Sequence, residues 1–130
     1  MKQSREICKI YQSQAKIAQA EFKDIVERSV ILNHPSGEPS KLRLFLVDET
    51  IVDVWYSVKE KYSYHWEAQT ARGNIYRYDN APHKSWGHIS TFPKHFHNGQ
   101  EDKVKESYLS DDPEEGIRDF LSFKRRLWSF

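Results

Sequence analysis

Cysteine, methionine and glycine are scarce in this chain, with one Cys, one Met and five Gly among 130 residues. The single Cys8 has no partner for an internal disulfide, so we expect a cytoplasmic protein kept in a reducing environment. Long apolar runs are missing as well, and we therefore expect neither a secretion signal nor a membrane span.

An excess of charge of one sign is also missing, because 20 basic and 19 acidic residues leave a net charge of +1. Such a balance gives no chain-wide attraction to nucleic acid, so binding to nucleic acid would need a local basic patch. Seven Phe, seven Tyr and four Trp are too many aromatic residues for a disordered chain. We expect one folded domain spanning residues 1–130.

The first segment has the period of an amphipathic helix, with Ser4 as its N-cap. Its apolar side is formed by Ile7, Ile10, Tyr11, Ala18, Phe22 and Ile25. After this helix, a β-branched run at residues 29–32 is followed by Asn33, Pro35 and Gly37, which indicates a strand ending in a loop.

The middle of the chain alternates apolar and polar residues, with the turn signals DET, KEK and ARGN between the runs. One predicted face holds Leu42, Leu44, Leu46, Val52, Val54, Tyr56, Val58, Tyr62, Tyr64, Trp66 and Ala68. The other face holds Asp53, Trp55, Ser63, His65 and Glu67. Together with IYRYD at residues 75–79, this pattern predicts an antiparallel meander with one packed face and one polar face.

A second helix is predicted near the C-terminus, where Asp112 precedes Pro113 and two acidic residues occupy the first turn. Its apolar stripe is Ile117, Phe120, Leu121, Leu127 and Trp128, and its last turns carry Lys124, Arg125 and Arg126. The order helix, strands, helix predicts an α+β fold. We expect five or six antiparallel strands, mostly from residues 42–79, with both helices on one face.

The segment YRYDNAPHKSWGHISTFPKHFHNG, residues 76–99, holds four of the six histidines. One interpretation is a divalent metal site, such as a zinc site. His95 and His97 would share a face of an extended segment, with His83 or His88 as a third ligand and Asp79 as a fourth. This pattern is weak, because neither a Cys ligand nor an HExxH motif accompanies it.

A second interpretation is acid–base chemistry on RNA without a metal cofactor. Such a site needs a base for the 2′-hydroxyl, an acid for the leaving oxygen and cations for the phosphorane. We expect His83, His95 and His97 to converge with Arg77 at one exposed site that acts by proton transfer. Further substrate-binding candidates are Lys84 and Lys94 for phosphate, Asp79 or Asn80 for orienting an imidazole, and Trp86 or Phe96 for stacking on a base.

Ordinary structural roles also explain much of this segment. Arg77 could pair with Asp79 on its own strand face, Asn80 could cap a turn and Pro82 could end the strand. His34 and His65 read as a loop residue and a solvated strand residue. Three aromatic residues are expected in the core, namely Tyr76, Tyr78 and Phe92.

The pair of motifs YRYDNAPH and FPKHFH resembles the TumE family, whose pattern runs RYDNAPHH, a short spacer and FPHHKH. Residues 77–83 match the first part, and the resemblance extends loosely over residues 25–100. The second part is matched by Phe92, Pro93, His95 and His97. The departures are Lys84 and Lys94 in place of His and Phe96 in place of Lys.

The resemblance implies a toxin of a type II toxin–antitoxin system of bacteria and archaea, acting on RNA or on the ribosome, with ribonuclease activity as the leading expectation. It also implies a partner, a DNA-binding helix-turn-helix antitoxin encoded alongside. Two alternatives stay open. One is a metal-binding module, and the other is a non-catalytic interaction domain, derived from a toxin whose activity was lost through the changes in the motif. A membrane partner is not expected, and a homo-oligomer is left open.

Overall fold

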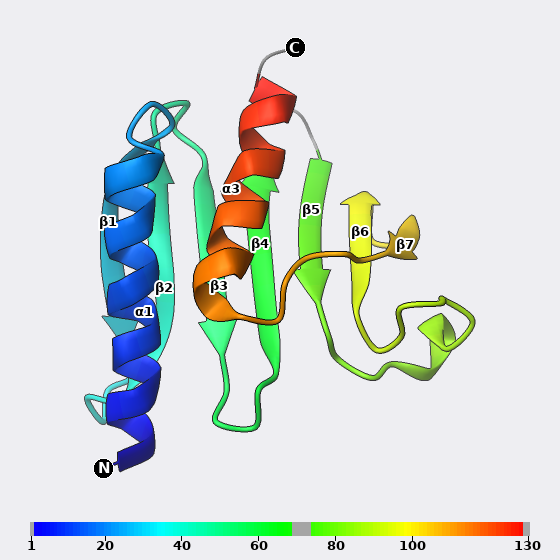
Figure 1. Ribbon diagram of the computed structural model, residues 1–130, viewed down its shortest axis with the longest axis horizontal. Coiled ribbons are helices and arrows are strands. Elements are labelled where there is room, and N and C mark those ends of the chain that lie inside the picture. The colour runs from blue at the N-terminus through cyan, green and yellow to red at the C-terminus, as the bar shows by residue number, and fades with distance from the viewer. Residues whose placement is uncertain (1, 69–73, 129–130) are drawn as a thin grey trace.

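The computed structural model describes residues 2–68 and 74–128, in which a helix precedes the strands and another follows them (Figure 1). The helices are α1 (Lys2–Glu21) and α3 (Pro113–Trp128), and a short 3-10 helix, η1, spans Lys84–Trp86. The strands are β1 (Val26–Asn33), β2 (Pro39–Leu46), β3 (Ile51–Tyr56), β4 (Tyr62–Ala68), β5 (Asn74–Asp79), β6 (His95–Gly99) and β7 (Val104–Glu106).

The strands form one antiparallel sheet in the order β1 to β7, so each strand pairs with the next one along the chain. The predicted α+β class and the meander are confirmed, and residues 39–79 supply β2 to β5. The expected five or six strands were too few, because the described residues form a sheet of seven. The additional strands lie where prolines and glycines obscure the alternation, and β7 has three residues, too few to show a period.

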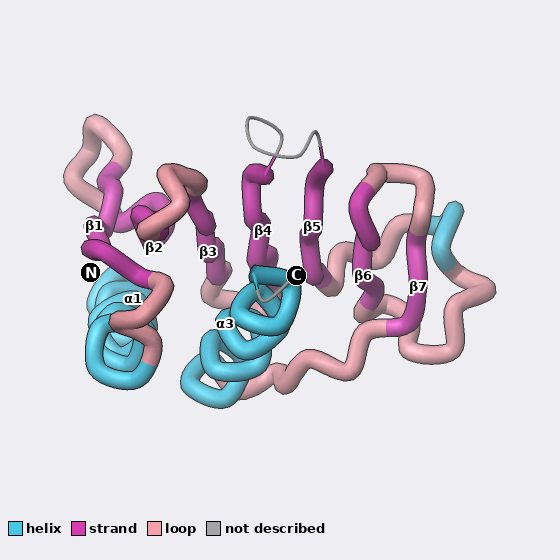
Figure 2. Tube along the Cα trace, turned by 90° about the horizontal axis from the view of Figure 1, so that it is seen from above, coloured by secondary structure: helices cyan, strands magenta, loops and turns pink. Residues whose placement is uncertain are grey.

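Both helices lie on one face of the sheet, as predicted (Figure 2). The alternation of the meander decides which side chains they cover, since successive strand residues point to opposite faces. Leu42, Leu44, Val52 and Val54 are buried beneath the helices, while Trp55 on the opposite face is exposed. Val58 departs from the prediction because β3 ends at Tyr56, which leaves Val58 in an exposed turn.

Helix α1 packs its predicted stripe against the sheet, with Ile7, Tyr11 and Ala18 buried. The Tyr11 hydroxyl accepts a hydrogen bond from the backbone N–H of Tyr56 at 3.0 Å, which ties the helix to β3. The predicted cap was wrong, since the helix begins at Lys2 and Ser4 lies within it. The helix also ends at Glu21, so the buried Phe22 and Ile25 belong to the connection into β1.

Helix α3 begins as its sequence predicts, with Asp112 Oδ2 accepting a hydrogen bond from the backbone N–H of Glu115 at 3.0 Å. Ile117, Phe120 and Leu121 are fully buried. Lys124 lies in the last turns with Arg125 and Arg126 as the sequence shows, and its side chain is only 1 % exposed. Its ammonium group lies 3.2 Å from Asp48 and 4.4 Å from the centre of the Trp66 ring, so the buried charge is paired.

Parts of the sequence prediction lie outside the described residues. They are most of the predicted ARGN turn, namely Ala71, Arg72 and Gly73, and the side chains of Ser4, Ala68 and Trp128.

Candidate functional site

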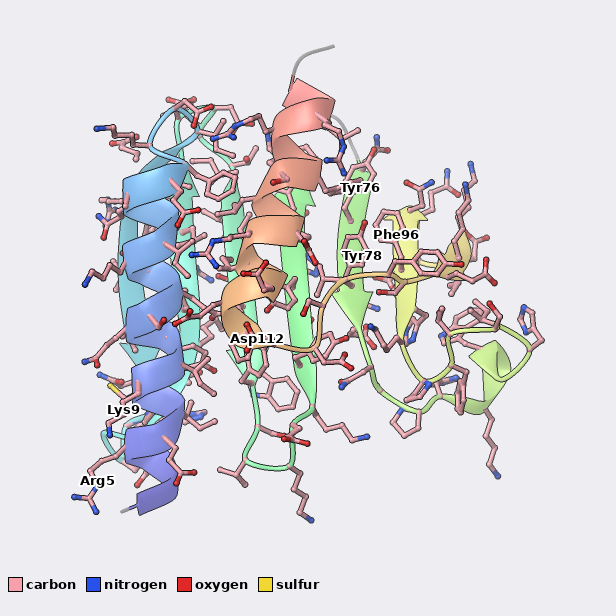
Figure 3. All side chains as sticks on the ribbon, in the orientation of Figure 1. Arg5, Lys9, Tyr76, Tyr78, Phe96 and Asp112 are labelled. Atoms are coloured by element: carbon pink, nitrogen blue, oxygen red, sulfur yellow. The ribbon has the colours of Figure 1, made fainter. Side chains whose placement is uncertain are left out.

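The candidate site lies where β5 and β6 pair. In this antiparallel register Arg77 is directly opposite His97, and Asp79 is directly opposite His95. All four residues occupy alternate positions and therefore face the side of the sheet without helices. Tyr76, Tyr78 and Phe96 occupy the positions between them and face α3 (Figure 3).

The four side chains meet around the carboxylate of Asp79. Its Oδ1 lies 3.0 Å from His95 Nε2, and its Oδ2 lies 2.9 Å from Arg77 Nε and 3.8 Å from His97 Nε2. Arg77 Nη2 is 3.1 Å from His97 Nε2. The structure thus brings Arg77, His95 and His97 together, and Asp79 takes the orienting role that was considered for it.

Backbone carbonyls hold the other nitrogen of each imidazole. His95 Nδ1 lies 2.8 Å from the carbonyl oxygen of Pro93, and His97 Nδ1 lies 2.8 Å from that of Glu101. Because a carbonyl oxygen can only accept a hydrogen bond, both Nδ1 atoms carry a proton. Each ring is therefore fixed in orientation, with Nε2 directed into the cluster.

The two histidines differ in protonation because their Nε2 atoms face different partners. A guanidinium group can only donate, so His97 Nε2 accepts from Arg77 and the ring is neutral. Burial lowers the pKa of His97, and the charge of Arg77 lowers it further. These two effects outweigh the hydrogen bond to the Glu101 carbonyl, which acts to raise the pKa. Burial also acts to lower the pKa of His95, but its hydrogen bonds to Asp79 and to the Pro93 carbonyl outweigh burial and raise it.

Glu101, in the turn between β6 and β7, completes the cluster. Its two carboxylate oxygens accept from Arg77 Nη1 at 2.8 Å and Nη2 at 3.0 Å, a bidentate arrangement that fixes the guanidinium plane. Sequence reasoning missed this residue, and NGQED at residues 98–102 carries no signal beyond that of a polar turn. Burial acts to raise the pKa of Asp79, but hydrogen bonding from His95 and its other partners lowers it, so Asp79 is ionised.

The site is closed, which contradicts the prediction of an exposed one. The His95 and His97 side chains are each 3 % exposed, and Asp79 is also buried. The segment between β5 and β6 folds back as expected, but it places Trp86 of η1 against both imidazoles. The ring centres are 6.3 Å apart for Trp86 and His95 and 6.0 Å apart for Trp86 and His97.

Other candidates do not join the cluster. His83 was predicted to be catalytic, but it is exposed, and its Nδ1 accepts a hydrogen bond from the backbone N–H of Ser85. His88 is exposed as well, and so is Lys84 on η1. Lys94 lies just before β6, where its ammonium group pairs with Asp111 at 3.4 Å.

Asn80 has the structural role that was considered for it. Its side chain accepts from the backbone N–H of Tyr62 at 2.8 Å and donates to the carbonyl of Glu60 at 3.0 Å, which holds the turn between β3 and β4. It therefore does not orient an imidazole.

Two aromatic residues of the segment, Phe92 and Phe96, differ in burial from what the sequence predicted. Phe96 was considered as a platform for a base, but it is buried and stacks on Tyr78 with the ring centres 4.2 Å apart. Tyr76 and Tyr78 pack against the core as expected. Phe92 was assigned to the core but is exposed.

The cluster also has the composition of a metal site. Asp79, His95 and His97 each offer one ligand atom, and these atoms lie within 4.8 Å of one another. This set differs from the predicted one, since His83 and His88 are not part of it. Arg77 already places a positive charge against His97 Nε2 and Asp79 Oδ2, so a metal ion here would have to displace the guanidinium group.

A cavity of about 550 Å³ lies on the helix side of the sheet and adjoins the cluster at Pro93 without including its side chains. Its walls include Ile7, Ile10, Tyr56, Phe92 and Lys94, and neither His95 nor His97 lines it. Cavity size is therefore a poor guide to the candidate site, whose groups are packed against one another rather than around an open space.

The fold and the cluster define a small α+β protein with a closed His–Asp–Arg site on the uncovered face of its sheet. The chain belongs to the TumE toxin family, because the family model described as Toxin TumE matches residues 14–127. Comparisons with curated proteins and with solved structures gave no match.

Membership of this family makes the protein a toxin-like component of a toxin–antitoxin system, with a cognate antitoxin as its partner. The matched residues include all seven strands, the site and nearly all of α3. Among the described residues, neither long helix has the length and apolar character needed to cross a bilayer.

Proposed function

We propose that this protein is a cytoplasmic ribonuclease that cleaves RNA by acid–base chemistry at Arg77, His95 and His97. The observation that carries the proposal is the pairing of two imidazoles with opposite protonation, whose ring centres are 5.0 Å apart. Neighbouring groups whose environments push their pKa values apart are suited to act as a base and an acid in one reaction.

In the proposed reaction, neutral His97 takes the proton of a 2′-hydroxyl through Nε2. The 2′-oxygen attacks the phosphorus, and the bond from phosphorus to the 5′-oxygen breaks. Protonated His95 gives its Nε2 proton to that leaving oxygen, so the products are a 2′,3′-cyclic phosphate and a free 5′-hydroxyl. Arg77 stabilises the charge that develops on the phosphorane, and Asp79 holds His95 in place.

RNA can reach these atoms after Trp86 has moved away from the imidazoles, since both rings are buried in the closed form. The phosphate would then replace the Glu101 carboxylate on Arg77, which already has the bidentate geometry used for phosphate. The target class is cellular RNA, free or in the ribosome. A type II arrangement follows if the cognate helix-turn-helix antitoxin inhibits the protein by direct binding.

The test is cleavage of labelled RNA by purified protein, with product analysis for a 2′,3′-cyclic phosphate. We expect His95→Gln and His97→Asn each to lower the rate by about 10²–10⁴-fold, the usual loss when a general acid or base is removed. His83→Gln and His88→Gln are matched controls, because both residues lie in the same segment and are exposed. Wild-type cleavage by His97→Asn, or a product without a cyclic phosphate, would contradict the mechanism.

A metal-dependent activity is the second candidate, and the ligand set Asp79, His95 and His97 favours it. Both imidazoles donate Nδ1–H to backbone carbonyls, an arrangement that commonly orients metal-bound histidines. If the activity depends on a metal, a divalent ion such as zinc would copurify with the protein, and a chelator would abolish activity. Arg77→Ala also separates the two mechanisms, because it would impair acid–base cleavage but remove the charge that competes with the ion.

A non-catalytic domain derived from a toxin is the remaining alternative. Expression without the antitoxin distinguishes it, because an active toxin arrests growth and the His97→Asn variant does not. Equal growth of cells expressing either form would support the loss of activity in this chain.

A further inference from the structure

Beside the closed site, the uncovered face of the sheet carries an exposed aromatic residue and a hollow. Trp55 on β3 is 43 % exposed although its neighbours Val54 and Tyr56 are buried. The hollow has a volume of about 300 Å³. It is lined by Lys41, Asp53, Trp55, Ser63 and His65.

The strand register makes this hollow continuous with the candidate site. Two rows of directly opposed residues cross from β3 to β6 on the uncovered face. The first row is Trp55, Ser63, Asp79 and His95, and the second is Asp53, His65, Arg77 and His97. Neighbouring strands lie about 4.8 Å apart, so Trp55 stands about 10 Å from Asp79 and about 15 Å from His95 along its row.

We propose that the hollow binds one unpaired base of single-stranded RNA, stacked on Trp55, while the attached backbone runs past His65 to Arg77. The choice of RNA rests on the ribonuclease function proposed above. Ser63 lies between Trp55 and Asp79, and its short side chain leaves room for a base beside the indole. Aromatic stacking of this kind accepts any base, because every base offers a π face.

The charges around the hollow indicate that stacking rather than phosphate attraction dominates binding. Lys41 lies 3.3 Å and Arg43 2.8 Å from Asp53, so these three residues together supply a net charge of +1. A site with few free cations releases few counterions. We therefore expect binding whose affinity depends weakly on salt and strongly on the indole of Trp55.

The test is binding of a short, labelled, single-stranded DNA oligonucleotide, which cannot be cleaved because it lacks the 2′-hydroxyl, measured by fluorescence anisotropy. We expect Trp55→Ala to weaken binding about tenfold and Trp55→Phe to retain most of the affinity. Tyr108→Ala is the matched control, because Tyr108 is an aromatic side chain that is 81 % exposed and does not line the hollow. Thermal unfolding of each variant checks that the fold is unchanged, as expected for a side chain outside the core.

Wild-type affinity in Trp55→Ala would overturn the proposal. So would a variant that keeps its affinity for the oligonucleotide but no longer binds the antitoxin, because the surface would then belong to a protein partner. Failure of the ribonuclease proposal looks different: the oligonucleotide binds through Trp55, but RNA is not cleaved by the wild-type protein. RNA cleavage that is unaffected by Trp55→Ala would instead leave the ribonuclease intact and remove the base site.

Discussion

At the scale of single residues, the chemistry of the site comes from what each nitrogen faces. His95 and His97 belong to the same short strand and are equally buried, yet one lies beside a carboxylate and the other beside a guanidinium group. Burial acts to lower the pKa of both. The partner of Nε2 therefore decides that His95 carries a second proton there and that His97 does not.

This difference predicts a bell-shaped dependence of RNA cleavage on pH. The pKa of His97 lies below its usual 6.5, so the base is lost as the pH falls through this lowered pKa. The pKa of His95 lies above 6.5, so the acid is lost as the pH rises through this raised pKa. We expect maximal cleavage between the pKa of His97 and that of His95, and a single limb in place of a bell would contradict the assignment of roles.

The same shifts have opposite effects on stability, which unfolding experiments measure without any substrate. Between pH 6.5 and the raised folded pKa of His95, the folded state binds more protons than the unfolded state, so stability falls as pH rises. Between the lowered folded pKa of His97 and pH 6.5, the unfolded state binds more protons, so stability falls as pH falls. His95→Gln should flatten the alkaline loss and His97→Asn the acidic loss.

At the scale of elements, the alternation of apolar and polar residues was sufficient to predict the meander and the faces of β2 to β5. The residue types of the motif also placed Arg77, His95 and His97 in one site, with Asp79 as a possible orienting residue. They wrongly included His83 in it. The Glu101 carboxylate and the position of Trp86 could not be predicted, because they depend on how two turns close in space. The burial of Lys124 escaped prediction for a similar reason, since its partner Asp48 lies in a distant turn.

The contact between α3 and β4 gives a prediction about packing. A Cβ at Gly116 would meet the Tyr64 hydroxyl and would lie 3.1 Å from the carbonyl of Ser110. The Tyr64 hydroxyl cannot yield freely, because it is buried and bonded to Tyr56 and to Gln14. Gly116→Ala should therefore lower the free energy of unfolding by about 1–3 kcal/mol, although alanine favours a helix more than glycine does.

Urea unfolding measures this change, and Ser122→Ala is a control that alters the same helix without the clash. In the double variant Gly116→Ala/Tyr64→Phe, the hydroxyl that a Cβ would meet is gone. Its loss of stability should be smaller than the sum of the two single losses. Additive losses would show that the cost arises elsewhere in the helix.

At the scale of the whole molecule, both helices cover one face, and the candidate site and the Trp55 hollow share the other (Figure 2). An antitoxin that binds the outside of this face can block access without touching the buried imidazoles. Arg77 is paired with Glu101 and Asp79, so the closed site offers no free guanidinium to such a partner. Toxicity and antitoxin binding should therefore depend on different residues.

This separation is testable with the neighbouring gene product as the antitoxin. We expect wild-type protein to arrest growth when expressed alone and to copurify with the antitoxin when both are expressed. His97→Asn should abolish the arrest but retain the complex, because the His97 side chain is 3 % exposed and its hydrogen bond to the Glu101 carbonyl can be replaced by the Asn amide. If the variant lost both properties while circular dichroism showed a folded protein, His97 would contribute to the antitoxin interface, and the proposed isolation of the site from its partner would be wrong.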